Sequence, residues 1–142
     1  MVLWASAELL PGQVTVIGLT RDRDELYERI RARLLHMVYE QGVINEVRQL
    51  LRLPVSRTVR QMHGLADIEG YLAGKASLKD TILGWQQRVR NYAKRQLTWF
   101  RQIPRIQWAA LAPDERPWET AQRLLDVVRR DRLQRVEVGS SP

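Results

Sequence analysis

The sequence predicts a mainly α fold, a helical bundle built around one long helix, with a minimal pair of β-strands. Apolar residues recur at helical spacing over most of the chain, whereas residues 13–19 and 105–111 read as short strands. The 142 residues are enough for one domain with its own core, and 44% hydrophobic with 27% charged residues is typical of a globular protein.

The first strand and the first helix follow one another near the start of the chain. Residues 13–19 (QVTVIGL) are rich in β-branched side chains and follow Pro11-Gly12, so they predict a buried strand. Residues 22–25 (DRDE) are typical of a helix start, and Gly42 supplies the stop. The helix between them carries apolar residues at helical spacing, namely Leu26, Ile30, Leu34, Met37 and Val38.

Two shorter helices are predicted next. One ends before Pro54, because the residue before a proline disfavours helical backbone. The other covers about residues 62–73 and is followed by Gly74. Their buried faces are expected to consist of Ile44, Val47, Leu50 and Leu51 in the first helix and of Leu65, Ile68 and Leu72 in the second.

The longest helix is predicted from about residue 78 to 103, between the Ser77 and Asp80 pair and Pro104. A rotation of about 100° per residue separates its side chains into two faces. The apolar face holds Ile82, Val89, Tyr92, Ala93, Leu97, Phe100 and Ile103. The basic face holds Arg88, Asn91, Lys94, Arg95, Thr98, Arg101 and, if the helix reached that far, Arg105.

The remaining elements are a strand and a helix. Residues 105–111 (RIQWAAL) predict the second strand, and Pro117 opens a last amphipathic helix. We expect a single partial domain over residues 1–128 and a basic, frayed tail over residues 129–142.

The distribution of charge favours an anionic partner. The net charge is +7, from 20 Arg and 3 Lys against 16 acidic residues. Placement is more informative, because residues 81–113 hold six basic residues and no acid, and residues 48–66 hold four Arg and no acid. A solvated helix usually mixes both signs, since opposite charges four residues apart stabilise it.

Several function classes are not favoured. The apolar runs are far too short for a membrane-spanning helix, and the first ten residues lack the pattern of a signal peptide, so we expect a cytoplasmic chain without a membrane partner. There is no Cys, and His36 and His63 alone cannot build a zinc site.

Five ordered blocks carry a resemblance to a known family. They read VTVIGLTRDRDELYERI, GVINEVRQLL, GYLAGKASLKD, YAKRQLTWFR and IQW, over about residues 14–110. This order is similar to the C-terminal half of tRNA dimethylallyltransferases, which transfer a dimethylallyl group from its diphosphate to the adenosine next to the anticodon, with Mg²⁺. The resemblance implies that the two strands belong to the parallel sheet of a P-loop-type α/β domain, of which this chain forms a C-terminal part.

The resemblance also implies where the family's chemistry lies. Its P-loop, general-base Asp and phosphate-binding Arg lie in the N-terminal half, so we expect no catalytic residue, metal site or cofactor within this chain. The segment Gly70–Ala76 (GYLAGKA) is not a P-loop, because three residues separate its glycines instead of four and Ala76 stands where a magnesium-binding hydroxyl is required. It also falls at a predicted helix end instead of after a strand.

Two segments resemble parts of the family that face the tRNA anticodon stem-loop. The KRQ-x-TW-x-R strip matches in full, and in the Gly-Tyr-Lys/Arg segment Gly64 is retained while Leu65 and Ala66 replace the other two residues. The tRNA-binding residues implied by the resemblance and by the basic face are Lys94, Arg95, Gln96, Thr98, Trp99, Arg101, Arg88, Gln61 and Gly64.

Each of these signals also has a purely structural interpretation. Trp99 lies at the border of the two faces, where core packing is favoured over stacking on a base. His63 reads as a polar residue flanking a helix, and Asp22, Asp24 and Glu25 read as acids that complement a helix dipole. The basic face alone would be a solvated surface about half the time.

Two alternatives remain open for the fold and two for the function. The chain is either a mostly helical remnant with exposed strand edges or a piece that sits beside a separate P-loop half. Functionally it is either the tRNA-binding portion of a tRNA dimethylallyltransferase, inactive by itself, or a non-enzymatic RNA-binding or interaction module derived from that family.

Overall fold

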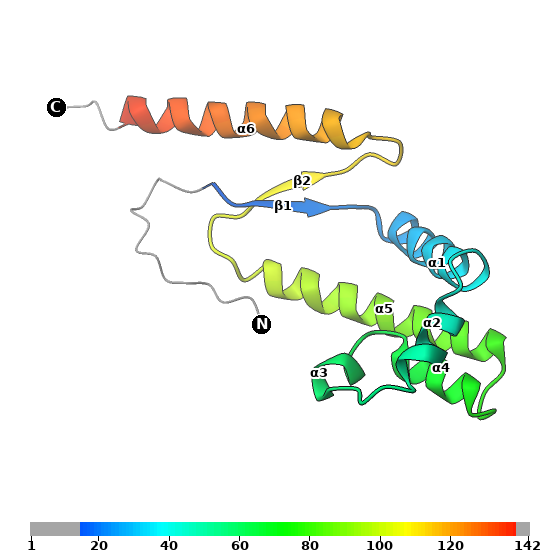
Figure 1. Ribbon diagram of the computed structural model, residues 1–142. Coiled ribbons are helices and arrows are strands. Elements are labelled where there is room, and N and C mark those ends of the chain that lie inside the picture. The colour runs from blue at the N-terminus through cyan, green and yellow to red at the C-terminus, as the bar shows by residue number, and fades with distance from the viewer. Residues whose placement is uncertain (1–14, 139–142) are drawn as a thin grey trace. The chain divides into compact units, whose positions relative to one another are not determined.

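The computed structural model describes residues 15–138, and the contacts divide the chain into two compact units. The helical unit covers Arg23–Trp99, and the sheet unit consists of the residues up to Asp22 and from Phe100 onward. The elements in chain order are β1 (Ile17–Thr20), α1 (Arg23–Tyr39), α2 (Val43–Leu50), α3 (Arg57–Arg60), α4 (Leu65–Leu72), α5 (Leu78–Phe100), β2 (Gln107–Ala110) and α6 (Pro117–Val138), as Figure 1 shows.

The helical unit has a continuous hydrophobic core to which α1, α2, α4 and α5 contribute. Ile68 on α4 is 2% exposed and Trp85 on α5 is 3% exposed, so both side chains are enclosed. The apolar positions that the helical spacing predicts for α1, α2 and α4 all lie in or against this core. The buried cluster comprises Ile30, Leu34, Val43, Val47, Leu65, Ile68 and Trp85.

The start of α5 is fixed by a reciprocal pair of hydrogen bonds. The backbone N–H of Asp80 donates to Ser77 Oγ over 3.1 Å, and Ser77 Oγ–H donates to Asp80 Oδ2 over 2.6 Å. These bonds satisfy one of the free N–H groups of the first turn, so the helix begins where the sequence predicts.

The sheet unit contains a two-stranded parallel sheet. Its register pairs Ile17 with Gln107 and Thr20 with Ala110. Gly18 pairs with Trp108, and a Cβ atom at Gly18 would come within 2.7 Å of the Trp108 ring. The glycine therefore allows the indole to lie against β1.

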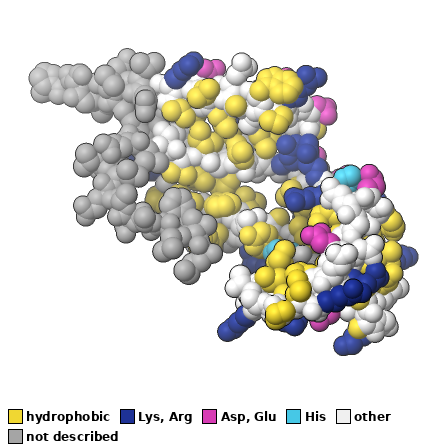
Figure 2. Space-filling model, in the orientation of Figure 1, with side chains coloured by type: hydrophobic (Ala, Val, Ile, Leu, Met, Phe, Trp, Pro, Cys, Tyr) yellow, Lys and Arg dark blue, Asp and Glu magenta, His cyan; other side chains and the backbone are white. Residues whose placement is uncertain are grey.

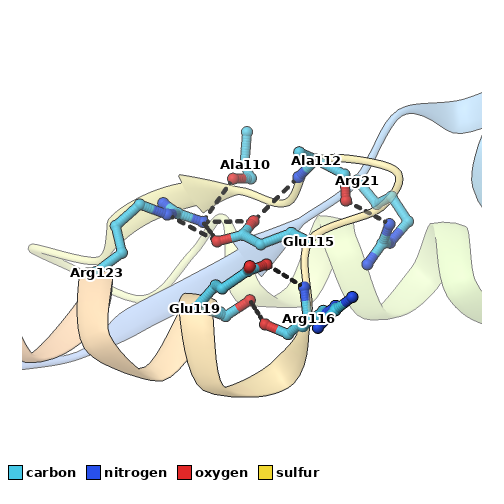
Figure 3. Close-up of polar contacts among 8 residues, drawn as sticks. Arg21, Ala110, Ala112, Glu115, Arg116, Glu119 and Arg123 are labelled. Carbon is cyan, nitrogen blue, oxygen red and sulfur yellow. Dashed lines mark hydrogen bonds and ion pairs between the residues drawn. The ribbon is translucent and has the colours of Figure 1, made fainter.

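Helix α6 is joined to β2 by polar contacts at its start (Figure 3). Arg123 Nη2 donates to the carbonyl oxygen of Ala110 over 2.9 Å, and its Nε donates to Glu115 over 3.0 Å. Glu115 also accepts the backbone N–H of Ala112, and the Arg123 guanidinium together with this N–H lowers the pKa of the Glu115 carboxyl. The N–H of Arg116 donates to Glu119 Oε2 over 2.8 Å, which caps the first turn.

The structure confirms the predicted fold class, mainly helical with a minimal parallel β pair, and differs from the prediction at element boundaries. Residues 13 and 14 lie outside the described residues, and β1 extends to Thr20. Helix α5 ends at Phe100, three residues earlier than predicted, and α6 continues past Arg129 to Val138 where a frayed tail was expected. The short helix α3 was not predicted; Ser56 caps it by accepting the N–H of Val59.

Candidate nucleic-acid interface

The C-terminal half of α5 carries the predicted basic strip on an exposed surface. Lys94, Arg95, Gln96 and Thr98 are exposed on the helix, and Arg101 is exposed directly after its end. Among the described residues, no carboxylate pairs with Lys94, Arg95 or Arg101. The strip therefore presents positive charge that the rest of the described chain leaves uncompensated.

Arg88 has a different environment from the other predicted contacts. Its Nε donates to both Asp67 oxygens, over 2.9 and 3.1 Å, and its Nη2 contacts Oδ1. The Asp67 side chain is 4% exposed and that of Arg88 is 61% exposed. This carboxylate raises the pKa of Arg88 and compensates its charge, so Arg88 ties α5 to α4.

Tyr27 on α1 lies among three cations. The guanidinium carbons of Arg90 and Arg23 lie 4.6 and 5.3 Å from the centre of its ring. Hydrogen bonding to Arg23, followed by the charges of Arg23 and Lys94, lowers the pKa of Tyr27. Arg90 Nε is buried and has no hydrogen-bond partner among the described residues. Of these cations, Arg23 lies on α1 and Arg90 and Lys94 lie on α5, so Tyr27 lies between the start of α1 and the strip.

The loop from Gln61 to Gly64 is set by the conformation of its glycine. Gly64 has φ 91°, in the left-handed region, and a Cβ atom there would overlap the Trp85 indole. The loop backbone is closed by hydrogen bonds from the N–H of Met62 to the carbonyl of Val59 and from the N–H of Leu65 to the carbonyl of Met62. Gln61 is exposed on this loop.

The same loop brings His63 against α5. The ring centres of His63 and Tyr92 lie 4.6 Å apart with the planes tilted by 55°. The Arg95 guanidinium lies 6.0 Å from the centre of the Tyr92 ring. The two segments implied to face tRNA, around Gly64 and around Arg95, are therefore neighbours in space. Sequence reasoning missed this contact, because the helical projection assigned Tyr92 to the apolar face.

The exposed aromatic residues of α5 overturn two predictions. Trp99 is 65% exposed, so the core-packing interpretation of this residue is wrong. Tyr92 and Phe100, predicted on the buried face, are 40% and 42% exposed. Ile82 and Trp85, near the start of α5, are buried. Beyond about residue 91, the described residues do not fully cover the apolar face of the helix.

The remaining candidates include the acidic residues at the start of α1. Glu25 forms an ion pair with Arg29 over 3.0 Å in the first turns of α1, and Asp24 lies in the first turn, as the helix-dipole interpretation predicts. Among the side chains that the structure describes, between residues 15 and 129, no group of three or more His, Cys, Asp or Glu could hold a metal ion.

The segment that superficially resembles a P-loop ends helix α4. Gly74 has φ 70°, its N–H donates to Tyr71, and the N–H of Lys75 donates to Gly70. These bonds close the helix end, as the sequence predicts. None of the helices that the structure describes is both long and apolar enough to cross a membrane.

The fold of this chain is similar to that of solved tRNA isopentenylpyrophosphate transferases. The full-length tRNA isopentenylpyrophosphate transferase of Bacillus halodurans matches with a TM-score of 0.75 and 30% identity, over 89% of this chain and 42% of that protein. A tRNA isopentenylpyrophosphate transferase of Staphylococcus epidermidis matches with a TM-score of 0.70 and 25% identity, over 83% of this chain and 39% of that protein.

Sequence comparison gives the family itself. The IPP transferase family model matches residues 4–103, so the chain belongs to the IPP transferase family. The tRNA dimethylallyltransferase of Alkaliphilus oremlandii is 46% identical over 101 residues, which are 70% of this chain and 32% of that protein. That of Natranaerobius thermophilus is 31% identical over 126 residues, 87% of this chain and 37% of that protein. The chain thus spans about a third of the length of the curated relatives it matches.

Proposed function

We propose that the strip formed by Lys94, Arg95, Gln96, Thr98, Trp99 and Arg101, together with the loop of Gln61 and Gly64, binds the anticodon stem-loop of tRNA. The observation that carries this proposal is the uncompensated charge of Lys94, Arg95 and Arg101 on an exposed helix surface. A carboxylate on this surface would repel the phosphate backbone, which accounts for the absence of Asp and Glu from residues 81–113. A tRNA-binding role is consistent with a cytoplasmic location.

The cations do not contribute equally to this surface. Arg88 is held by Asp67, so its charge adds little to the attraction for phosphate, although its exposed guanidinium edge remains near the strip. Lys94 and Arg101 have no such partner among the described residues. We therefore expect Lys94, Arg95 and Arg101 to dominate the electrostatic part of binding.

The test is a titration of tRNA against the chain over a range of salt concentrations. If about four to six cations each displace a counterion, the logarithm of the affinity falls against the logarithm of salt with a slope of roughly −3 to −5. The double variant Lys94→Glu, Arg101→Glu should bind at least about tenfold more weakly at low salt, because each reversal replaces an attraction for phosphate with a repulsion.

A matched control separates local contact from overall charge. Arg33 and Lys75 are exposed and lie away from the strip in the sequence, and Arg33→Glu with Lys75→Glu changes the net charge by the same amount. This control should bind tRNA nearly as well as the parent, and both double variants should keep their helicity, since surface substitutions usually cost within about 0.5 kcal/mol. Equal weakening by both variants, or a parent without a salt slope, contradicts the proposal.

We also propose that these 142 residues alone do not transfer a prenyl group. The support is chemical: the P-loop-like segment is a helix end, and the described residues offer no grouped metal ligands. Dimethylallyl diphosphate, Mg²⁺ and tRNA incubated with the purified chain should yield no modified adenosine by mass spectrometry. Modified adenosine above the level of a protein-free control contradicts this part of the proposal.

The sheet unit supports a further partner, the P-loop half of an α/β domain. Paired residues of a parallel sheet face the same side, so Leu19 and Trp108 lie on opposite faces of the β1–β2 pair, and both are exposed, by 50% and 40%. Parallel sheets are normally covered on both faces. Additional strands and helices, from the same longer protein or from another chain, would complete this sheet.

A further inference from the structure

His63, Tyr92 and Arg95 form a cluster of aromatic and basic side chains on the surface of the helical unit. Tyr92 is 40% exposed although its ring touches His63, and Met62, which precedes His63 in the sequence, is 60% exposed. His63 is itself exposed, and Arg95 borders the Tyr92 ring at 6.0 Å. This cluster is neither buried as a core nor paired with a carboxylate among the described residues.

We infer that His63 and Tyr92 form a stacking site for one unpaired RNA base, with Arg95 placed to contact the adjoining phosphate. This inference rests on the proposed tRNA-binding function and names the part of the RNA that this place would recognise. Proteins that bind single-stranded RNA combine a basic surface with exposed aromatic rings, because every base offers a face on which a ring can stack. A paired base is already stacked in its helix and cannot use such a site.

The two rings are held by rigid parts of the helical unit. Tyr92 projects from α5, which the Asp67–Arg88 ion pair fastens to α4 one turn earlier. His63 precedes Gly64, whose left-handed conformation and close approach to the buried Trp85 fix the direction of the loop. The His63–Tyr92 distance therefore follows from the core, so the aromatic surface exists before RNA arrives and little ordering entropy opposes binding.

Charge favours RNA over an apolar partner at this place. His63 and Tyr92 each lie in a stretch of sequence without an acidic residue, residues 48–66 and residues 81–113. A hydrophobic peptide would gain nothing from Arg95, whereas a nucleotide offers both a ring and a phosphate. The acids that follow the loop on α4 are both paired: Asp67 with Arg88, and Glu69 with Arg60 at 3.8 Å.

Nuclear magnetic resonance of the full chain provides a direct test, since the sequence has two histidines, His36 and His63. Addition of single-stranded oligoadenylate should move the Hε1 resonance of His63 upfield through the ring current of the stacked base. His36, whose Nδ1 lies 2.9 Å from Glu40 on α1, is the internal control and should not move. A fully paired RNA duplex should leave both resonances in place. If His63 is unaffected by oligoadenylate at saturation, the stacking site does not exist.

Two substitutions of Tyr92 separate the effect of a stacking ring from that of apolar side-chain volume. Tyr92→Phe keeps the ring and should bind oligoadenylate like the parent, whereas Tyr92→Leu keeps apolar volume without a π face and should bind about tenfold more weakly. Because stacking is not screened by salt, this ratio should persist at high salt, and both variants should bind duplex RNA equally well.

The same measurements distinguish this inference from the proposed function. Equal binding of oligoadenylate by Tyr92→Leu and Tyr92→Phe overturns the stacking site, even if the Lys94→Glu, Arg101→Glu variant loses tRNA affinity as expected. Loss of duplex and single-strand affinity to the same degree in Tyr92→Leu also overturns it, because it would indicate a general effect on the surface. Helicity of each variant, measured by circular dichroism, confirms that the comparison is made between folded chains.

Discussion

The two units of the chain bury their apolar residues to very different extents. In the helical unit, a cluster that includes Ile68 and Trp85 is enclosed on all sides by helices. In the sheet unit, Ala109 is the sole buried hydrophobic residue among those described, whereas Trp108, Trp118 and Leu125 are at least 40% exposed. Figure 2 shows hydrophobic side chains gathered over α6 and the strands on the face in view.

This difference indicates which unit is stabilised by its own contacts. Burial of a large apolar side chain contributes about 1.5–3 kcal/mol, so the helical unit gains from each of its enclosed residues. The sheet unit is held mainly by the ladder of β1 and β2 and by polar contacts such as Arg123 with Glu115. Two strands with little buried surface are marginally stable in water. The basic strip therefore lies almost entirely on the unit that buries its own core, with Arg101 alone of its residues in the sheet unit.

The difference in burial between the two units predicts its largest effect for a shortened side chain in the core of the helical unit. Ile68→Ala should lower the free energy of unfolding of the helical unit by about 2–5 kcal/mol, because it removes enclosed methyl groups and leaves a cavity. Leu125→Ala, at a position 54% exposed in the sheet unit, should cost less than about 1 kcal/mol. Hydrogen–deuterium exchange with peptide-level mass spectrometry reports on each unit separately. A similar gain in exchange from both variants would show that the units do not differ as their burial indicates.

The second prediction concerns Gly64, the glycine that positions the loop from Gln61 to Gly64. Gly64→Ala should destabilise the helical unit by about 2–4 kcal/mol, because the backbone is left-handed and the new methyl group overlaps Trp85. Gly42 has φ 70°, but a methyl group added there would meet no atom within 4 Å, so Gly42→Ala should cost about 1–2 kcal/mol. Urea denaturation of the two variants isolates the steric part. Equal midpoints would mean that the loop moves away from Trp85 at little cost.

Much of the helical unit could be predicted from the sequence, because its elements are long or clearly bounded. The Ser77 and Asp80 pair gives the start of α5, and the apolar positions of α1 and α4 have helical spacing. Helix α3 was missed because four residues are too few to show a period, and a cap at Ser56 is its main signal. A pattern of such length does not distinguish a helix from a loop.

The candidate site was predicted in part, for a reason that the helix itself explains. The basic residues of α5 follow from the sequence, since a helical projection gives the face of each side chain relative to its neighbours. The same projection does not say where along the helix the packing ends, so Tyr92 and Trp99 were assigned to buried surroundings that the structure does not provide. The His63–Tyr92 contact joins two elements, and periodicity within one element carries no information about it.

A third prediction tests the incomplete covering of the sheet unit. Exposed apolar residues on both sheet faces and unpaired strand edges favour association between copies of the chain. Leu19→Lys with Trp108→Lys should shift the chain toward monomer in analytical ultracentrifugation, because both side chains are exposed and the new charges repel. The control Leu53→Lys replaces a residue 62% exposed in the helical unit and should leave association unchanged. A parent chain that is already monomeric at high concentration contradicts this prediction.

The smallest expected effect is a titration in the helical unit that leaves stability at neutral pH unchanged. Hydrogen bonding to Arg23, and then the charges of Arg23 and Lys94, lower the folded-state pKa of Tyr27 below its ordinary value of about 10. Ionisation of Tyr27 thus adds stability that is fully present above the unfolded pKa and is lost as the pH falls through the folded pKa. Below the folded-state pKa the phenol is protonated in both states and contributes nothing through this linkage.

Tyrosinate absorbance should therefore show Tyr27 ionising at a lower pH than an ordinary tyrosine does. Tyr27→Phe should remove this early step without changing the melting temperature at neutral pH, because the ring that Arg90 contacts is retained. Arg23→Gln should move the step to higher pH by more than Lys94→Gln does, since Arg23 is the larger cause of the shift. The order of the two variants is decisive: a larger movement with Lys94→Gln would place the phenol closer to the strip on α5 than to the first turn of α1, and the described arrangement of Tyr27 would then be wrong.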